Sequence, residues 1–187
     1  MTRHPKSLGK SAHRRPVPRR ERRPRAEALE PRWMPATITV TSLADAVATG
    51  DGVTLREAIT AANTDTSIDG SAAGSGADTI LFAPGLFSGG DQAITLGLFD
   101  TGLDPDEFGP SALRIRSDVT IRGPAGDNGL TIRRAAPDPN AFRLFYVYDA
   151  ATPSNARLRL EDLTLQGGLA RGFDGAGAGG GAAGMGG

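Results

Sequence analysis

The densest group of side chains able to do chemistry is a run of carboxylates near the middle of the chain. Asp104, Asp106 and Glu107 lie close together in the stretch DTGLDPDEFG. Carboxylate oxygens are the ligands that Ca²⁺ prefers, and carboxylate pairs act as acid and base in glycoside hydrolysis. The spacing is not that of an EF-hand, because counting from Asp104 places Phe108 at position 5 and Ile115 at position 12. We predict either a loose Ca²⁺ site at Asp104, Asp106 and Glu107 or, as the plainer alternative, an acidic solvated loop.

Other polar residues have simpler interpretations. Asp118 and Asp162 begin two similar segments, and we interpret them as turn or strand-end residues. Tyr146 and Tyr148 alternate along RLFYVYD and would share an outer face on which a sugar could stack. Five arginines either form a basic stripe or pair with acidic neighbours, the second being the default: Arg114, Arg116, Arg122, Arg133 and Arg134.

Composition excludes several kinds of catalytic centre from most of the chain. There is no Cys, and both His and both Lys residues lie within the first 13 positions. A Cys or His nucleophile, a His base and a thiolate or imidazole metal site are therefore excluded downstream. No phosphate loop or dinucleotide fingerprint is visible either. We predict that the protein is not an enzyme.

Charge divides the chain into two unlike parts. Residues 1–32 hold eleven of the 21 basic residues and three of the 21 acidic ones, which leaves the remainder acidic. A basic, Pro-punctuated leader could bind nucleic acid, but no aromatic residues interleave with its arginines and the acidic part would repel phosphate. No apolar run of about 18 residues and no signal-peptide apolar region is present. We predict a disordered leader at 1–34, no nucleic-acid partner and no transmembrane segment.

One helix is predicted in a chain otherwise composed of strands. Four apolar residues of TLREAITAAN recur at helical spacing: Leu55, Ala58, Ile59 and Ala62. Thr54 and Glu57 have the spacing of a capping box. Short alternating runs bounded by turn residues predict the strands. They are ATITVTS (36–42), DTILFA (78–83), QAITLG (92–97), ALRIRSDVTIRGP (112–124), GLTIRR (129–134), RLFYVYD (143–149) and ARLRLEDLTLQGG (156–168).

The later strands indicate a stacked repeat. SDVTIRGP and LEDLTLQGG are similar, and their aligned positions Val119 and Leu163 are 44 residues apart, with LFYVYD between them. That spacing suits two successive turns of roughly 20 residues each. An antiparallel β-sandwich with coincidentally similar strands is the alternative. A helix of ten residues must dock to be stable, so we expect TLREAITAAN to cover the exposed N-terminal end of a β-helix.

VTLREAI (53–59) resembles the signature of the CSLREAI domain, found near the start of large bacterial surface proteins related to polymorphic outer-membrane proteins. The likeness extends over most of residues 37–168 and includes GADTILFAP, RIRSDVTIRGPAG and DLTLQGG. Val53 and Thr54 replace the family's Cys and Ser, so any redox role of that Cys is excluded. The resemblance implies an all-β fold, the capping end of a right-handed parallel β-helix in an exported protein.

Leu29 to Met34, LEPRWM, is similar to the LEPR-XLL motif of leaders of long surface proteins, chiefly from Planctomycetes, although Pro35 replaces the last Leu. We therefore expect a leader at 1–34, a CSLREAI-like region at 35–168 and a Gly-rich flexible tail at 169–187 of a truncated chain. The two ends are expected to contribute nothing to the fold.

The expected function is that of a non-catalytic structural or adhesive segment at the cell surface or outside the cell. The partner would be an extracellular glycan or a surface protein, and an open C-terminal β-edge would be free to self-associate. The alternative is the first part of a carbohydrate-active β-helix enzyme whose catalytic coils are missing.

Overall fold

The computed structural model describes residues 34–99, 110–135, 141–148, 151 and 155–170. The chain divides into two compact units, Met1–Pro31 and Arg32–Gly187, and only the second contains described residues. No helix in the described ranges has the length and apolar character needed to cross a membrane.

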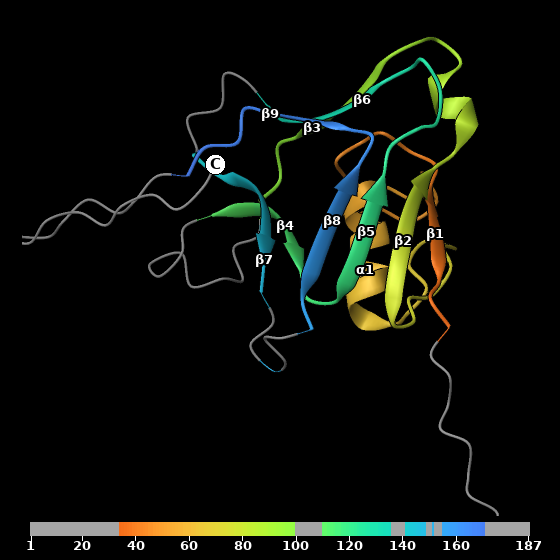
Figure 1. Ribbon diagram of the computed structural model, residues 1–187, viewed down its shortest axis with the longest axis vertical. Coiled ribbons are helices and arrows are strands. Elements are labelled where there is room, and N and C mark those ends of the chain that lie inside the picture. Colours follow the sequence, from red (N-terminus) through yellow and green to blue (C-terminus); the bar gives the residue numbers. More distant parts are fainter. Residues whose placement is uncertain (1–33, 100–109, 136–140, 149–150, 152–154, 171–187) are drawn as a thin grey trace, which may run out of the picture. The chain divides into compact units, whose positions relative to one another are not determined.

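Nine short strands and two helical segments make up the described part of the second unit (Figure 1). In chain order they are β1 (Thr37–Val40), α1 (Leu55–Thr64), β2 (Ala77–Phe82), the 3₁₀ turn η1 (Pro84–Phe87), β3 (Gln92–Leu96), β4 (Ser111–Ile115), β5 (Asp118–Arg122), β6 (Leu130–Arg134), β7 (Arg143–Val147), β8 (Arg157–Glu161) and β9 (Thr164–Gln166). Each predicted strand segment overlaps at least one of these strands. The structure is therefore mostly β, with one short α-helix.

The strands form three parallel sheets. Sheet A has the order β1-β2-β5-β8, sheet B the order β3-β6-β9, and sheet C pairs β4 with β7. From β2 onward, successive described strands enter the sheets in the order A, B, C, and every pairing among them is parallel, as is that of β1 with β2. The antiparallel sandwich considered as an alternative is therefore wrong.

Aliphatic side chains stack along each sheet and form the core. In sheet A, Ile38, Ile80 and Ile121 are adjacent in register and all three are fully buried. The last strands are more exposed: Leu165 of β9 is 44% exposed and Val147 of β7 is 42% exposed. Burial therefore falls from the first strands of the stack towards the last described ones.

The predicted repeat length is wrong. One turn of the chain, from Ile80 to its sheet neighbour Ile121, takes 41 residues and not the roughly 20 predicted. The turn is longer because the chain adds one strand to each of the three sheets before it returns to sheet A. Two predicted segments each contain a bend between two strands, and in the second Asp162 adopts a positive φ of 53°. The two similar segments, SDVTIRGP and LEDLTLQGG, therefore supply strands to different sheets: the first forms β5 of sheet A, and the second contains β9 of sheet B. Asp118 lies beside Arg157 in register, not beside Asp162.

Candidate functional site

Helix α1 begins with the capping box that the sequence predicts. The Thr54 hydroxyl accepts a hydrogen bond from the Glu57 amide at 3.2 Å, and the Glu57 carboxylate accepts one from the Thr54 amide at 2.9 Å. The helix ends at Asp65, whose left-handed backbone (φ 50°) directs its amide to the Ala61 carbonyl. The chain thus satisfies orphan groups at both helix ends without outside partners.

The apolar face of α1 is buried against strands of two sheets. Leu55 and Ile59 are 1% and 2% exposed, and the helix packs against β1, β2 and β4. Burial of each of these side chains contributes roughly 1.5–3 kcal/mol. The prediction that this short helix docks on the β-core is confirmed.

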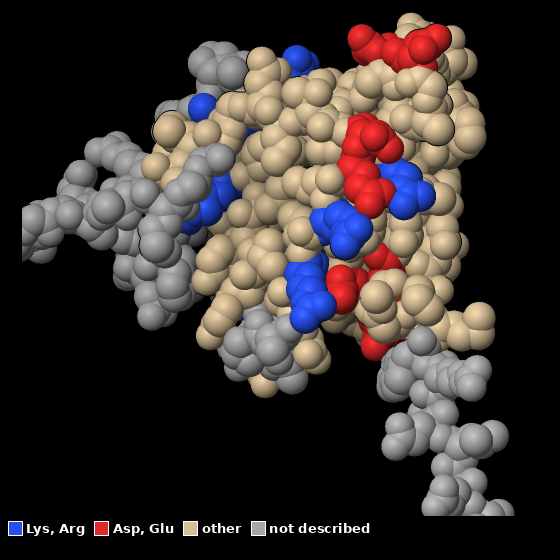
Figure 2. Space-filling view, viewed as in Figure 1, with Lys and Arg blue, Asp and Glu red and all other residues tan. Residues whose placement is uncertain are grey.

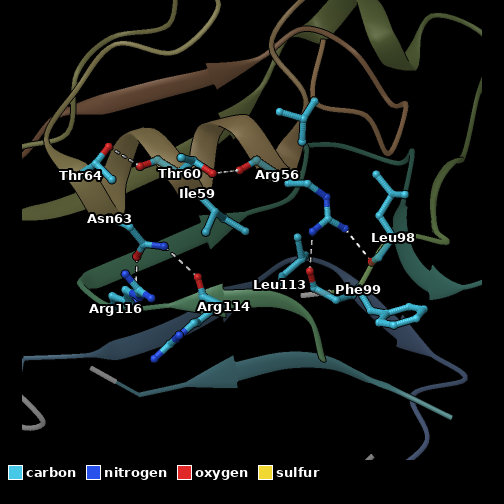
Figure 3. Close-up of a pocket in the computed structure, with 12 residues that line it drawn as sticks. Arg56, Ile59, Thr60, Asn63, Thr64, Leu98, Phe99, Leu113, Arg114 and Arg116 are labelled. Atoms are coloured by element: carbon cyan, nitrogen blue, oxygen red, sulfur yellow. Dashed lines mark hydrogen bonds between the residues drawn. The ribbon is translucent and has the colours of Figure 1, made fainter. Parts of the chain in front are cut away.

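Polar side chains of α1 form hydrogen bonds with the backbone of β4, the first strand of sheet C. Asn63 acts on this strand as a neighbouring peptide group would: its Nδ2 donates to the Arg114 carbonyl at 2.8 Å, and its Oδ1 accepts from the Arg116 amide at 2.7 Å (Figure 3). In the first turn of the helix, Arg56 Nη1 donates to the Ala112 carbonyl at 2.5 Å. The Ala112 and Arg114 carbonyls and the Arg116 amide thus have side-chain partners. Without these partners they would be free to pair with another strand.

Asp45 fixes Arg56 in place. Its Oδ1 lies 2.8 Å from Arg56 Nη2, and its Oδ2 accepts from the Gly97 and Leu98 amides at 2.8 Å each. Arg56 Nη2 also donates to the Leu98 carbonyl. The Arg56 and Asp45 side chains are 15% and 6% exposed, so this ion pair is shielded from solvent. It joins the loop before α1, the helix and the connection after β3.

A cleft of about 480 Å³ lies between α1 and β4 (Figure 3). Its lining residues are Val47, Arg56, Ile59, Thr60, Asn63, Thr64, Leu98, Phe99, Ala112, Leu113, Arg114 and Arg116. Its volume is within the range typical of small-molecule sites. Three arginines and no carboxylate are among these described lining residues, and Asp45 neutralises one of the three, Arg56.

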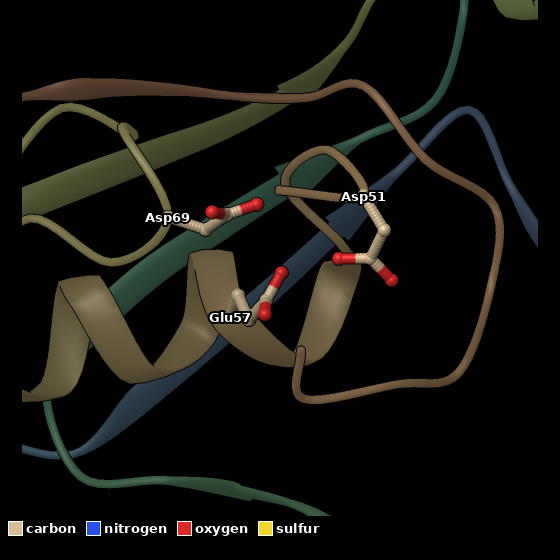
Figure 4. A group of neighbouring side chains, drawn as sticks. All are labelled: Asp51, Glu57 and Asp69. Atoms are coloured by element: carbon tan, nitrogen blue, oxygen red, sulfur yellow. The ribbon is translucent and has the colours of Figure 1, made fainter. Parts of the chain in front are cut away.

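Three carboxylates, those of Asp51, Glu57 and Asp69, bring oxygen atoms within 4.8 Å of one another (Figure 4). Hydrogen bonds from backbone amides hold two of these carboxylates, those of Glu57 and Asp69, in place. Both Glu57 oxygens accept backbone amides, from Ala48 and Thr54, and Asp69 accepts the Gly50 amide at 2.7 Å. Oxygen ligands of this kind suit Ca²⁺, but the loop geometry is explained without an ion.

Asp78, at the start of β2, is a buried carboxylate with only one satisfied oxygen. Its Oδ1 accepts from the Ala36 amide at 3.0 Å and the Ser75 amide at 2.8 Å, whereas its Oδ2 has no partner within the described structure. Burial raises the pKa of this carboxyl above its usual range, and the negative charge of Asp65 adds to the increase. The two amide hydrogen bonds oppose the rise in pKa but do not cancel it.

The residues proposed for Ca²⁺, Asp104, Asp106 and Glu107, lie outside the described ranges, so that site stays a prediction. The rings of Tyr146 and Tyr148 lie side by side, with centroids 6.0 Å apart.

The five arginines do not form one stripe, because they belong to three sheets: Arg114 and Arg116 at β4, Arg122 on β5, Arg133 and Arg134 on β6. On sheet A, acidic and basic side chains interleave, as in the 2.6 Å pair between Arg122 and Glu161 (Figure 2).

The contacts that Arg56, Asn63 and Asp45 make with distant segments were not predicted from the sequence. Arg56 and Asn63 are seven residues apart, so they share one face of α1, and this spacing is visible in the sequence. Asp45 gives no such signal, because its partners lie 11 and more than 50 positions away.

No protein-family model, curated protein or solved structure matches the chain.

Proposed function

We propose that residues 35–168 are the N-terminal end of a right-handed parallel β-helix, and that α1 is its cap. The support comes from three parallel sheets entered in a fixed order and from the Asn63 side chain, whose amide occupies the outer edge of β4. A cap that pairs with an edge prevents that edge from recruiting other strands. The Asn63 contacts are the observation on which this proposal rests.

The protein then serves as a non-catalytic structural or adhesive segment of an exported surface protein. Two observations favour a structural role: the buried Glu57 and the Asp45 side chain, which is 6% exposed, both use their carboxylate oxygens to hold backbone amides. The resemblance of VTLREAI and LEPRWM to segments of surface proteins supports a location at the cell surface or outside the cell. A glycan or another surface protein is the proposed partner.

The capping role is tested by a double substitution of the buried face of α1. Leu55→Asp with Ile59→Asp should expose the first strands and convert a soluble protein into aggregates, measured by light scattering after size-exclusion chromatography. Thr60→Asp with Thr64→Asp, on the exposed side of the same helix, is the matched control. Equal solubility of the two double variants would contradict the capping role.

The location is tested separately, by protease treatment of intact cells that produce the native protein. Loss of the antibody signal without cell lysis is expected for a surface protein. Full protection of the signal, with digestion only after lysis, would contradict the proposed location and leave the capping role untouched.

A further inference from the structure

The outer edge of β8 carries backbone groups that no described strand uses. β8 is the last strand of sheet A, and its other edge pairs with β5 (Figure 1). That pairing engages the Arg157 amide and the Glu161 carbonyl. Because the backbone groups of successive residues in a strand point to alternate edges, the N–H and C=O groups of Leu158 and Leu160 face the outer edge. These groups can hold one further strand.

Two arginine side chains project from this edge strand with little acidic compensation. Arg157 and Arg159 are two residues apart on the outer face of sheet A, and their side chains are 73% and 74% exposed. Asp118 approaches Arg157 only to 4.0 Å. Glu161 approaches Arg159 to 3.8 Å but has a closer partner in Arg122, at 2.6 Å. The edge therefore presents positive charge along its outer side.

The core side of the same strand is apolar and only partly covered. Leu158 and Leu160 pack against the core and are partly buried. In the last described strands of the neighbouring sheets, Val147 of sheet C and Leu165 of sheet B are 42% and 44% exposed. A strand that paired with β8 would bury its inward-facing apolar side chains beside this group, which is favourable.

The pairing of β5 with β8 shows which sequence fits this strand. The segment DVTIR of β5 is in parallel register with RLRLE of β8. An acid thus lies opposite Arg157, apolar residues lie opposite both leucines, and a base lies opposite Glu161. On the outer edge the same pattern would complement the charges, with a second acid opposite Arg159, where β5 has Thr120.

We propose that the outer edge of β8 binds an extended segment of a protein partner in which acidic and apolar residues alternate. The segment adds to sheet A as a parallel strand, with its acidic side chains opposite Arg157 and Arg159 and its apolar side chains inward beside Leu158 and Leu160. This inference rests on the adhesive role in the proposed function, for which it specifies the chemistry of a protein partner. It is independent of the capping role, because the Asn63 contacts are with β4 and not with β8.

The test is fluorescence anisotropy of the labelled peptide SDVEIRG, titrated with the full chain. This peptide is residues 117–123 with Glu in place of Thr120. Arg157→Glu with Arg159→Glu should weaken its binding by about tenfold to thirtyfold, because two exposed attractions become repulsions. The peptide SRVRIRG should have the reverse preference and bind the double variant better than the natural chain, which also shows that the variant is folded. Arg133→Glu, at an exposed position of sheet B, is the matched control and should change the affinity less than about twofold.

Backbone methylation separates strand addition from simple charge attraction. An N-methyl group on the Glu of SDVEIRG, whose amide would face β8, should abolish binding, whereas one on its Ile, whose amide would face away, should be tolerated. The inference is overturned if SDVEIRG does not bind, if both methylated peptides bind alike, or if Arg133→Glu weakens binding as much as the double variant does.

A second copy of the chain is the other occupant to be tested. If analytical ultracentrifugation shows that the natural chain is a dimer and that Arg157→Glu with Arg159→Glu is a monomer, the edge belongs to a second copy and the inference is overturned. A monomeric natural chain that binds SDVEIRG supports it. None of these results bears on the protease test of location or on the solubility test of the cap, so a failure here is distinguishable from a failure of the proposed function.

Discussion

Replacing Asn63 by Ala should lower the free energy of unfolding by about 1–2 kcal/mol. The substitution removes two hydrogen bonds to the backbone, at 2.8 Å to the Arg114 carbonyl and 2.7 Å from the Arg116 amide, and a longer one of 3.3 Å from the Ser117 hydroxyl, which also has the Ala62 carbonyl as an acceptor. Each such bond contributes about 0.5–1.5 kcal/mol net. Ala is the better helix former by up to about 0.7 kcal/mol, which offsets part of the loss. The remaining loss measures how much the side-chain amide stabilises the β4 edge.

Urea unfolding followed by circular dichroism would measure this difference. Thr60→Ala is the control, because that hydroxyl bonds only within α1, to the Arg56 carbonyl, and its loss should leave stability within about 0.5 kcal/mol. Asn63→Asp should destabilise as much as Asn63→Ala, since a carboxylate would place an acceptor against the Arg114 carbonyl. The Arg116 amide should also exchange faster in both Asn63 variants. If Asn63→Ala is as stable as Thr60→Ala, the amide does not hold the edge and the reasoning is wrong.

Two other predictions concern buried groups in sheet A and its connections. The pKa of the Asp78 carboxyl is raised in the folded protein, so ionising this group costs more in the folded than in the unfolded state. This cost lowers the free energy of unfolding as pH rises above the ordinary carboxyl pKa, and it is absent at lower pH, where the carboxyl is protonated in both states. Asp78→Asn should therefore gain stability over the natural protein between about pH 4 and pH 8 in urea titrations, and parallel curves for the two proteins would contradict this. Gly123→Ala should cost more than about 2 kcal/mol, because the added Cβ would stand 1.8 Å from the Asp162 carbonyl oxygen. Gly85→Ala, where nothing lies within 4 Å, is its control, and similar melting temperatures for these two variants would refute the steric argument.

Local signals in the sequence predicted the elements well. The capping box at Thr54 and Glu57 and the apolar spacing of α1 are short-range features, and the structure has the helix one residue away from its predicted bounds. Alternation likewise located all the strands in the described part of the chain. What alternation does not encode is where one strand stops and the next sheet begins, since both sides of a bend alternate in the same way. The segment 112–124 was for this reason one predicted run and is two strands of different sheets.

The cap contacts depend on residues far apart in the sequence. Asn63 reaches β4 across more than 50 positions, and Asp45 reaches the Gly97 amide across a similar separation. Neither polar side chain differs, in sequence alone, from a solvated residue at a helix end or in a loop. Only the placement of β4 beside α1 turns them into partners of a strand edge. The cleft between α1 and β4 is hidden from the sequence for the same reason.

The edge of β4 also explains why a helix, and not another strand, lies beside the first strand of sheet C. A strand that covered β4 would satisfy its backbone but would expose an identical row of groups on its own far side. A helix satisfies its backbone internally, so a helix that offers side-chain donors and acceptors can end the series. α1 does this with Arg56 and Asn63, placed one above the other on the face toward β4. At the opposite end, no described strand pairs with the outer edges of β7, β8 and β9, and core-position side chains such as Leu165 are exposed. In sheet C the two ends thus differ: side chains of α1 bind the outer edge of β4, whereas the outer edge of β7 has the geometry to which a further parallel strand would add.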